Sequence, residues 1–403
     1  MPPPYLAKIN TSAMDEVWKV ELSSSPLPFQ HQSSMALERG NTLLATFWNR
    51  ILRLSGDDGS ILQEGQLPTP EGSEVDNVSY THLIILSDGN VVAKSMSRRS
   101  GCQQQGPLAF AAAFLNCGSE LAPNSSLVLV DATSLRVLQE VGLGSFVGAR
   151  HTSTVHEGLE YVYVVLPDGR LRRYLYTRTQ LWLDSSWPGA SILTPGVPSA
   201  NGPTAAVPVN GWLVATTNSG PSPWPLTVTA VWQNDPSIVY QMQPFKDLSP
   251  HIDDTTFVSY SATQAAVDPH TNTVFMSDMI AGQMAAYNLT ASGFHHLWNF
   301  NLDFPVLMGP AGQRVLVAVN VSGIVGTPTP EAALTGAYPS QTLVFRHASN
   351  GSLVTQTAEL EGIAGIVPHT PGFDGQFFYL GSQKETLVRV TYDSGTCKSE
   401  PAA

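Results

Sequence analysis

The chain has 403 residues, a formal net charge of −12 and only 13% charged residues. With 20 basic against 32 acidic residues, it lacks the positive surface that nucleic acids and anionic membranes attract, so we exclude both as partners. Its most apolar short segment, residues 108–115, is far shorter than the roughly 20 residues of a membrane-spanning helix. The 33 glycines and 30 prolines favour many short strands joined by tight turns.

The pattern of N-glycosylation sequons favours secretion. Six sequons occur, more than the roughly three expected by chance for this composition. Residues 1–10 contain no apolar segment of the kind found in a signal peptide, so we expect the chain to be the mature form of a secreted, extracellular glycoprotein. The six asparagines are Asn10, Asn77, Asn124, Asn288, Asn320 and Asn350.

A hairpin pattern recurs from one end of the chain to the other. In each copy a short apolar stretch stops at a small polar turn and a second stretch follows. Internal periods of roughly 40 to 60 residues, each with several short strands, are typical of a β-propeller. Complete copies span residues 5–22, 49–67, 125–143, 170–187, 227–245, 283–300 and 342–360, and an incomplete one spans 386–393.

Residues 149–187 show most clearly how one repeat is built. Four strands are predicted here, over 150–155, 161–166, 171–177 and 180–187, separated by turns. The alternation of residues along the strands places apolar side chains on faces that can stack against neighbouring sheets. A sheet with two apolar faces buries both of them only when it lies between two other sheets. A closed ring of sheets satisfies this requirement.

The predicted fold is therefore all-β, with a single β-propeller domain spanning residues 1–403. Residues 15–22 have the composition of an outer strand without inner strands before them, and we expect them to complete the blade of 386–393, which removes an exposed sheet edge. This count gives seven blades; an eight-bladed ring is the alternative. The expected blades span residues 31–67, 81–143, 149–187, 203–245, 262–302, 304–360 and 364–393 together with 15–22.

The hairpins resemble the repeats of the quinoprotein-like propellers, which are named after pyrroloquinoline quinone. The matching segments are 55–67, 130–143, 287–300 and 346–360, with Trp18 and Trp298 in the usual aromatic position. The resemblance implies a propeller over most of the chain. Quinone-dependent dehydrogenases of this type are larger, have eight blades and carry an adjacent cysteine pair that is absent here, so we do not expect a quinone cofactor.

Four of the ten histidines precede the turn that follows the first strand of four different blades. Because first strands line the central channel of a propeller, such side chains can converge on one ion, and several neutral imidazoles suit copper, iron or zinc. The alternative is that they are partly buried side chains that bond neighbouring loops. The four candidate metal ligands are His31, His82, His151 and His369.

An acidic pair, Asp253 and Asp254, follows His251 just before the predicted fifth blade. These carboxylates are the candidate catalytic residues, as acid–base groups or as partners of a metal-bound histidine. Calcium binding is a weaker alternative, and an ordinary solvated turn is another.

Residues 97–124 form the longest insertion between predicted strands. Cys102 and Cys117 bracket its apolar middle, and we expect a disulfide between them, with two free buried thiols as the alternative. Such an insertion suits a lid or a docking arm for a protein partner, or a loop packed on its own blade. The pairing of Cys397 is left open.

Two classes of function follow from these features. The first is a propeller that binds a small organic ligand at its axial funnel, as a metal-dependent oxidoreductase or lyase. The second is a non-catalytic extracellular scaffold for glycans or proteins. The sequence contains no G-x-S-x-G, no phosphate-binding glycine loop and no C-x-x-C, so common hydrolase, kinase and redox-thiol mechanisms lack their usual signals.

Overall fold

The computed structural model describes most of the predicted strands, and the structural statements below concern the described residues. These residues are 5–10, 15–21, 35–38, 42–47, 49–70, 78, 80–95, 124–147, 149–192, 206–218, 226–245, 265–278, 283–301, 303–308, 315–322, 340–356, 360–361, 367–371, 376–381 and 386–391. Their contacts divide the chain into two units, residues 1–8 with 16–264 and residues 9–15 with 265–403. Each unit is described by itself.

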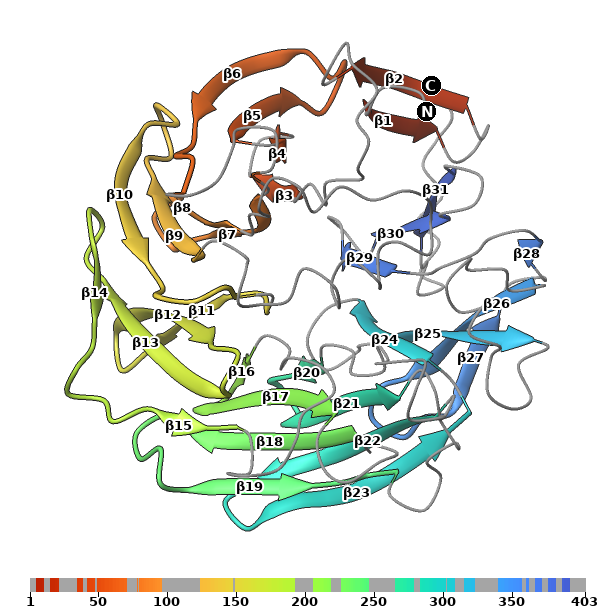
Figure 1. Ribbon diagram of the computed structural model, residues 1–403. Helices are drawn as coiled ribbons and strands as arrows, with labels where there is room; N and C mark the ends of the chain where they lie inside the picture. The colour runs from red at the N-terminus through yellow and green to blue at the C-terminus, as the bar shows by residue number, and fades with distance from the viewer. Residues whose placement is uncertain are drawn as a thin grey trace, which may run out of the picture. The chain divides into compact units, whose positions relative to one another are not determined.

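The first unit contains four antiparallel sheets that follow one another along the chain (Figure 1). The first sheet has the order β3 (Met35–Glu38), β4 (Thr42–Phe47), β5 (Arg50–Ser55) and β6 (Ile61–Gln66). The second has the order β7 (Tyr80–Ile85), β8 (Val91–Ser95), β9 (Ser126–Val130) and β10 (Val137–Gly142). The third has the order β11 (Thr152–His156), β12 (Leu159–Val165), β13 (Arg170–Tyr176) and β14 (Leu181–Leu183), with β15 (Ala190–Ser191) also on β13. The fourth has the order β16 (Val207–Val209), β17 (Trp212–Asn218), β18 (Leu226–Trp232) and β19 (Val239–Met242).

The second unit contains three further antiparallel sheets. One has the order β20 (Ala266–Asp268), β21 (Thr273–Asp278), β22 (Gln283–Thr290) and β23 (Gly293–Phe300). The next has the order β24 (Asp303–Met308), β25 (Val315–Ser322), β26 (Ser340–His347) and β27 (Leu353–Gln356), with β28 (Leu360–Glu361) also on β26. The last has three strands, β29 (Val367–Pro371), β30 (Gln376–Gly381) and β31 (Thr386–Thr391).

These sheets confirm the predicted all-β fold built from repeated antiparallel sheets. The sheets follow the predicted blade ranges to within a few residues, and the largest departure is β15, which lies beyond the predicted end at residue 187. Near the N-terminus, β2 (Asp15–Glu21) pairs with β1 (Tyr5–Asn10). Among the described strands no pairing joins β2 to β31. The number of blades and the closure through residues 15–22 stay predictions. No helix in the described part of the chain is long and apolar enough to cross a membrane.

Tight turns between the first and second strands are made by residues with positive φ. Asn210 and Gly211 join β16 to β17 with φ of 41° and 85°, and Glu157 and Gly158 join β11 to β12 with φ of 50° and 79°. Positive φ at both central positions is the signature of the type I′ turn, which matches the twist of a hairpin. Asparagine tolerates this conformation well, whereas glutamate is an unusual choice.

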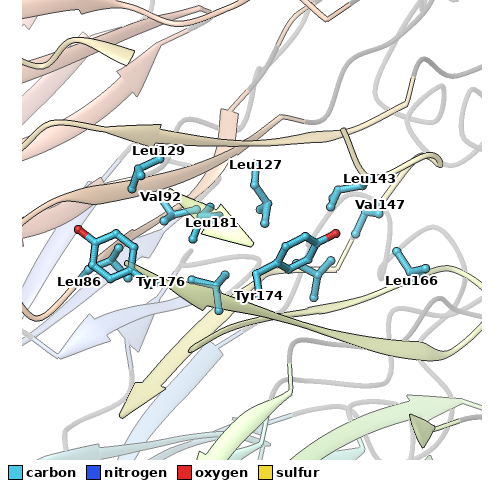
Figure 2. Packing of buried hydrophobic residues seen from close by; sticks show 12 residues of the cluster. Leu86, Val92, Leu127, Leu129, Leu143, Val147, Leu166, Tyr174, Tyr176 and Leu181 are labelled. Carbon is cyan, nitrogen blue, oxygen red and sulfur yellow. The ribbon is translucent and has the colours of Figure 1, made fainter. Parts of the chain in front are cut away.

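Within each unit, successive sheets pack face to face through apolar layers. The layer between the sheets β7–β10 and β11–β14 contains Val92 and Leu127 together with Val162 and Tyr174; Figure 2 shows this layer, with Val92, Leu127 and Tyr174 labelled. These four side chains are at most 1% exposed. First strands of successive sheets lie near each other, as β3 does to β7 and β11 to β16 in the first unit, and β20 to β24 and β24 to β29 in the second. Side chains on the first strands therefore lie at one edge of each apolar layer.

Candidate functional site

An irregularity in β7 positions the first candidate ligand. Tyr80 pairs with Ser95 and His82 pairs with Lys94, so the register shifts between the two pairs, as in a β-bulge. Bulges bend a strand and redirect its side chains, and they occur often beside functional sites. Because residues directly opposite each other in antiparallel strands share a face, His82 and Lys94 lie on the same side of this sheet.

The structure brings His82 into contact with His151, which directly precedes β11 of the next sheet. Their Nδ1 atoms are 3.2 Å apart, and the ring centroids are 4.7 Å apart with the planes at 86°. His151 is 1% exposed, and His82 is partly buried. Two of the four predicted ligands, from two different sheets, are thus neighbours.

Hydrogen bonding fixes how the protons are placed on this pair. The Nε2 of His151 lies 3.0 Å from the carbonyl oxygen of Val92, and since a carbonyl only accepts, this nitrogen carries the proton. Burial lowers the pKa of His151 to about 3, so the ring is neutral and its Nδ1 has a lone pair. Burial and then the neighbouring His151 lower the pKa of His82 well below its usual range. The Nδ1 of His151 can therefore accept a hydrogen bond from the Nδ1–H of His82 or coordinate an ion.

Lys94 completes this basic cluster. It is 0% exposed, and its Nζ donates a 2.5 Å hydrogen bond to the carbonyl oxygen of Val147. Burial lowers the pKa of Lys94 to about 7. The sequence analysis missed this residue, although a lysine within the mostly apolar segment 91–95 was a visible signal.

The geometry of the histidine pair is compatible with a shared metal ion. Two nitrogens bound to one ion at about 2.0–2.1 Å each, at a tetrahedral angle, lie about 3.3–3.4 Å apart, close to the 3.2 Å between the two Nδ1 atoms. The bond from His151 to the Val92 carbonyl is also the outer contact that metal-bound histidines usually make. Among the described residues no group of three or more histidine, cysteine or acidic side chains could hold a metal.

Several predicted site residues lie outside what the structure describes. They are His31, His251, Asp253, Asp254, Cys102, Cys117, Cys397 and residues 97–123 of the insertion. His369 lies in β29, but its side chain is not among those described. The metal site with four histidines, the acidic catalytic pair and the disulfide all stay predictions.

The described sequons differ in exposure. Asn124 and Asn350 are exposed, whereas Asn288 is partly buried within β22, where its Nδ2 donates a 2.8 Å hydrogen bond to the carbonyl oxygen of Thr271. The side chains of Asn10 and Asn320 and the whole of Asn77 lie outside the description. Glycosylation remains a prediction, with Asn124 and Asn350 the better placed acceptors.

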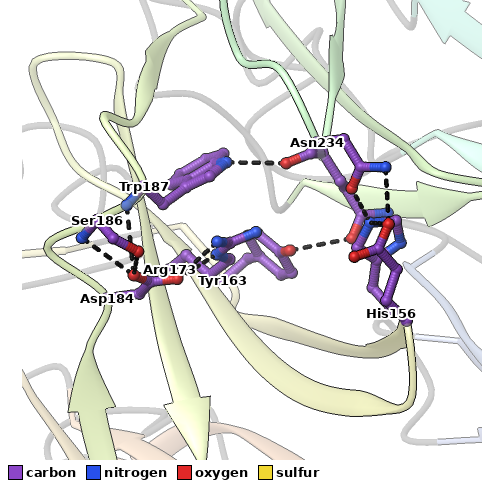
Figure 3. A network of polar contacts seen from close by, with 9 residues as sticks. His156, Tyr163, Arg173, Asp184, Ser186, Trp187 and Asn234 are labelled. Carbon is purple, nitrogen blue, oxygen red and sulfur yellow. Dashed lines mark hydrogen bonds and ion pairs between the residues drawn. The ribbon is translucent and has the colours of Figure 1, made fainter.

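A second polar network joins the sheets β11–β15 and β16–β19 (Figure 3). Arg173 donates to the carboxylate of Asp184 from Nε at 3.0 Å and from Nη2 at 2.5 Å. The guanidinium lies 4.4 Å from the ring centre of Tyr161 and 5.0 Å from that of Trp187. Trp187 donates from Nε1 to the carbonyl of Gln233 at 2.9 Å. Every strong donor here has an acceptor, so we assign this network to structure.

Comparisons with known proteins bear on the fold. The sequence matches no protein-family model and no curated protein. The structure is similar to that of the Dos1 propeller, with a TM-score of 0.50 and 10% identity over 93% of this chain and 78% of that one. It is also similar to the β-propeller domain of Cps50 (Swd1) from Myceliophteria thermophila, with a TM-score of 0.49 and 11% identity over 89% of this chain and 95% of that one. At 10% identity the likeness to the Dos1 propeller bears on the fold alone, and together with the repeated four-stranded antiparallel sheets it supports a β-propeller fold. Nothing in these neighbours is specific to the quinoprotein type.

Proposed function

We propose that this protein is a secreted, glycosylated, seven-bladed propeller that binds a small organic ligand at its axial funnel through a transition-metal centre. The ion is copper, iron or zinc, and the activity is that of a metal-dependent oxidoreductase or lyase. The observation that carries the proposal is the 3.2 Å contact between the Nδ1 atoms of His82 and His151. These two residues are 69 positions apart and come from different sheets.

The cost of this arrangement supports a functional role. Two imidazoles and a lysine share one buried region, and burial lowers the pKa of all three. In the described part of the chain none of these basic side chains pairs with a carboxylate. Burying them together reduces the stability of the folded protein, and strongly shifted pKa values concentrate at functional sites. Neutral imidazoles are also the protonation state that metal binding requires.

The remaining roles follow from the sequence. His31 and His369 are the further ligands, and Asp253 or Asp254 is the acid–base group or orients a ligand histidine. A bound transition metal would supply a Lewis acid that polarises an oxygen of the ligand. His151 would be held in orientation by its bond to the Val92 carbonyl, which keeps its Nδ1 directed at His82.

Elemental analysis of the purified protein tests the proposal. We expect about one transition-metal ion per chain, lost in the double variant His82→Ala/His151→Ala. The matched control is His295→Ala/His296→Ala, which removes two exposed histidines of β23. Circular dichroism reports whether each variant is folded.

Two results would overturn the metal proposal. One is wild-type protein that takes up no copper, iron or zinc when the ions are supplied after chelation. The other is a folded double variant that retains the ion as well as the β23 control does. If the double variant does not fold, His82→Gln alone, at the partly buried position, gives the same comparison with less disturbance of the core.

A second function, that of a non-catalytic assembly scaffold, is favoured by a different observation. Large apolar side chains are exposed on the fourth strand of several sheets, as with Leu62 (54% exposed) on β6 and Trp182 (54% exposed) on β14. Exposed apolar residues on edge strands are typical of interaction surfaces. A metal-free protein that forms defined oligomers, or that captures glycans, would support this function instead.

A further inference from the structure

The second unit contains a charged side chain within an apolar layer. Trp298 of β23 packs with Phe275, Leu316 and Val344 between the sheets β20–β23 and β24–β28. Arg346 of β26 pairs directly with Leu316 of β25, so it faces the same layer.

Arg346 has only part of its hydrogen-bonding capacity satisfied. Its guanidinium carbon lies 3.8 Å from the ring centre of Phe300, and its Nη1 donates a 2.6 Å bond to the carbonyl oxygen of Gly351. Its Nε is buried and has no partner. No carboxylate among the described residues pairs with it, and burial lowers the pKa of Arg346.

Trp298 presents a second unpartnered donor beside the same turn. The residue is 8% exposed, and its Nε1 is buried without a partner. A Cβ added at Gly351 would lie 2.9 Å from Cδ2 and 3.1 Å from Cε2 of this indole. The Trp298 ring and the Arg346 Nη1 therefore both contact Gly351, which has φ of 70°.

We infer that a small monatomic anion, chloride in ordinary media, binds between Arg346 and Trp298 and accepts hydrogen bonds from both. Two buried N–H donors and one uncompensated positive charge call for an acceptor that is negatively charged. A water molecule would accept from both donors, but it would leave the charge in place and bring two donors of its own into an apolar layer. Arg346 is only partly buried, so an ion can reach it from solvent. This inference is independent of the metal centre.

Chloride-dependent stability tests the inference. Chemical unfolding is followed at increasing sodium chloride, with the ionic strength held constant by sodium gluconate, whose anion is much larger than chloride. We expect a saturable increase: at ten times the chloride dissociation constant, the folding equilibrium constant rises about tenfold. Bromide should act similarly and give an anomalous scattering peak beside Arg346 Nε and Trp298 Nε1 in crystals.

The variants separate this site from general salt effects. Arg346→Met should abolish the chloride dependence, and Trp298→Phe, which keeps an aromatic ring but removes the donor, should weaken chloride binding several-fold. Arg50→Met is the control, because Arg50 already pairs with Glu64 at 2.6 Å in an exposed position, and it should respond like wild type. A wild-type protein that is indifferent to chloride would overturn the inference. So would an unchanged chloride response in Trp298→Phe, which is the variant to use if Arg346→Met does not fold.

Discussion

The third sheet of the first unit has two polar interfaces of opposite character. Toward the second sheet it buries His151 against His82 and Lys94, three basic groups whose pKa values are lowered. Toward the fourth sheet it buries Arg173 with a carboxylate partner, Asp184. The two interfaces share the same central sheet and similar apolar layers.

The difference lies in how charge is compensated. Burial alone would raise the pKa of Asp184, but hydrogen bonds from Ser186 and Arg173 outweigh burial and lower it. A charge pair with its bonds satisfied is costly to break. A basic cluster that has no counter-charge among the described residues reduces stability, and such clusters are more frequent at functional sites. We therefore assign the interface with the fourth sheet to structure, whereas the interface with the second sheet is the one to which the proposed function applies.

The largest expected effect comes from breaking the compensated pair. Arg173→Met leaves Asp184 as an uncompensated, mostly buried charge, since the two side chains are 11% and 15% exposed. We expect the free energy of unfolding to fall by about 3 kcal/mol, measured by urea denaturation. Arg170→Met on the same strand is the control, because its pair with Asp168 is 65% and 50% exposed and should change stability by only about 0.5 kcal/mol. Equal losses in both variants would contradict our reading.

The basic cluster of His82, Lys94 and His151 should make the stability of the protein depend on pH. Burial lowers the pKa of Lys94 to about 7 in the folded protein, against about 10.4 in an unfolded chain. Because the unfolded chain then binds the proton more tightly, stability decreases as the pH falls through this range, by about 2 kcal/mol between pH 9 and pH 7. Lys94→Met should remove this slope, as measured by denaturation at pH 7, 8 and 9 with a chelator present. A slope that persists in the variant would show that another group causes it.

A smaller loss of stability is expected when a buried tyrosine at either interface of the third sheet is replaced by phenylalanine. Both Tyr163 and Tyr174 are 1% exposed, but the Tyr163 hydroxyl donates a 2.9 Å bond to Gln233 Oε1. The hydroxyl of Tyr174 bonds to none of the residues that the structure describes. Tyr163→Phe should lower the unfolding free energy by about 1 kcal/mol, because it leaves a buried acceptor unpaired, and Tyr174→Phe should have less effect. The reverse order in denaturation midpoints would argue against a structural role for the Gln233 contacts.

Much of the fold could be predicted because it depends on local patterns. Alternating apolar residues and turn glycines placed the four strands of 149–187 within a few residues of β11–β14. The same spacing put His82 and His151 on corresponding first strands. The bulge beside His82 has no signature in sequence, so the position of Lys94 opposite it could not be foreseen. No local pattern marks Arg173 and Asp184 as buried, because their burial depends on a neighbouring sheet.

The smallest effect concerns the turn between β11 and β12, at an end of the fourth-sheet interface. Glu157 has φ of 50° before Gly158, where Asn210 has 41° before Gly211 in the turn between β16 and β17. A positive φ costs glutamate more than asparagine. Part of that cost is offset here, because Asn234 donates a 3.0 Å bond to Glu157 Oε1.

Exchanging the first residues of the two turns, Glu157 and Asn210, gives a pair of reciprocal variants. Glu157→Asn should raise the unfolding free energy by about 0.5 kcal/mol, and Asn210→Glu should lower it by about the same amount or more. If Glu157→Asn is instead destabilising, the contact with Asn234 is worth more than the backbone strain. The hairpin would then belong to the same compensated network as Arg173 and Asp184, and the double variant Glu157→Asn/Asn234→Ala would lose nothing beyond Asn234→Ala alone.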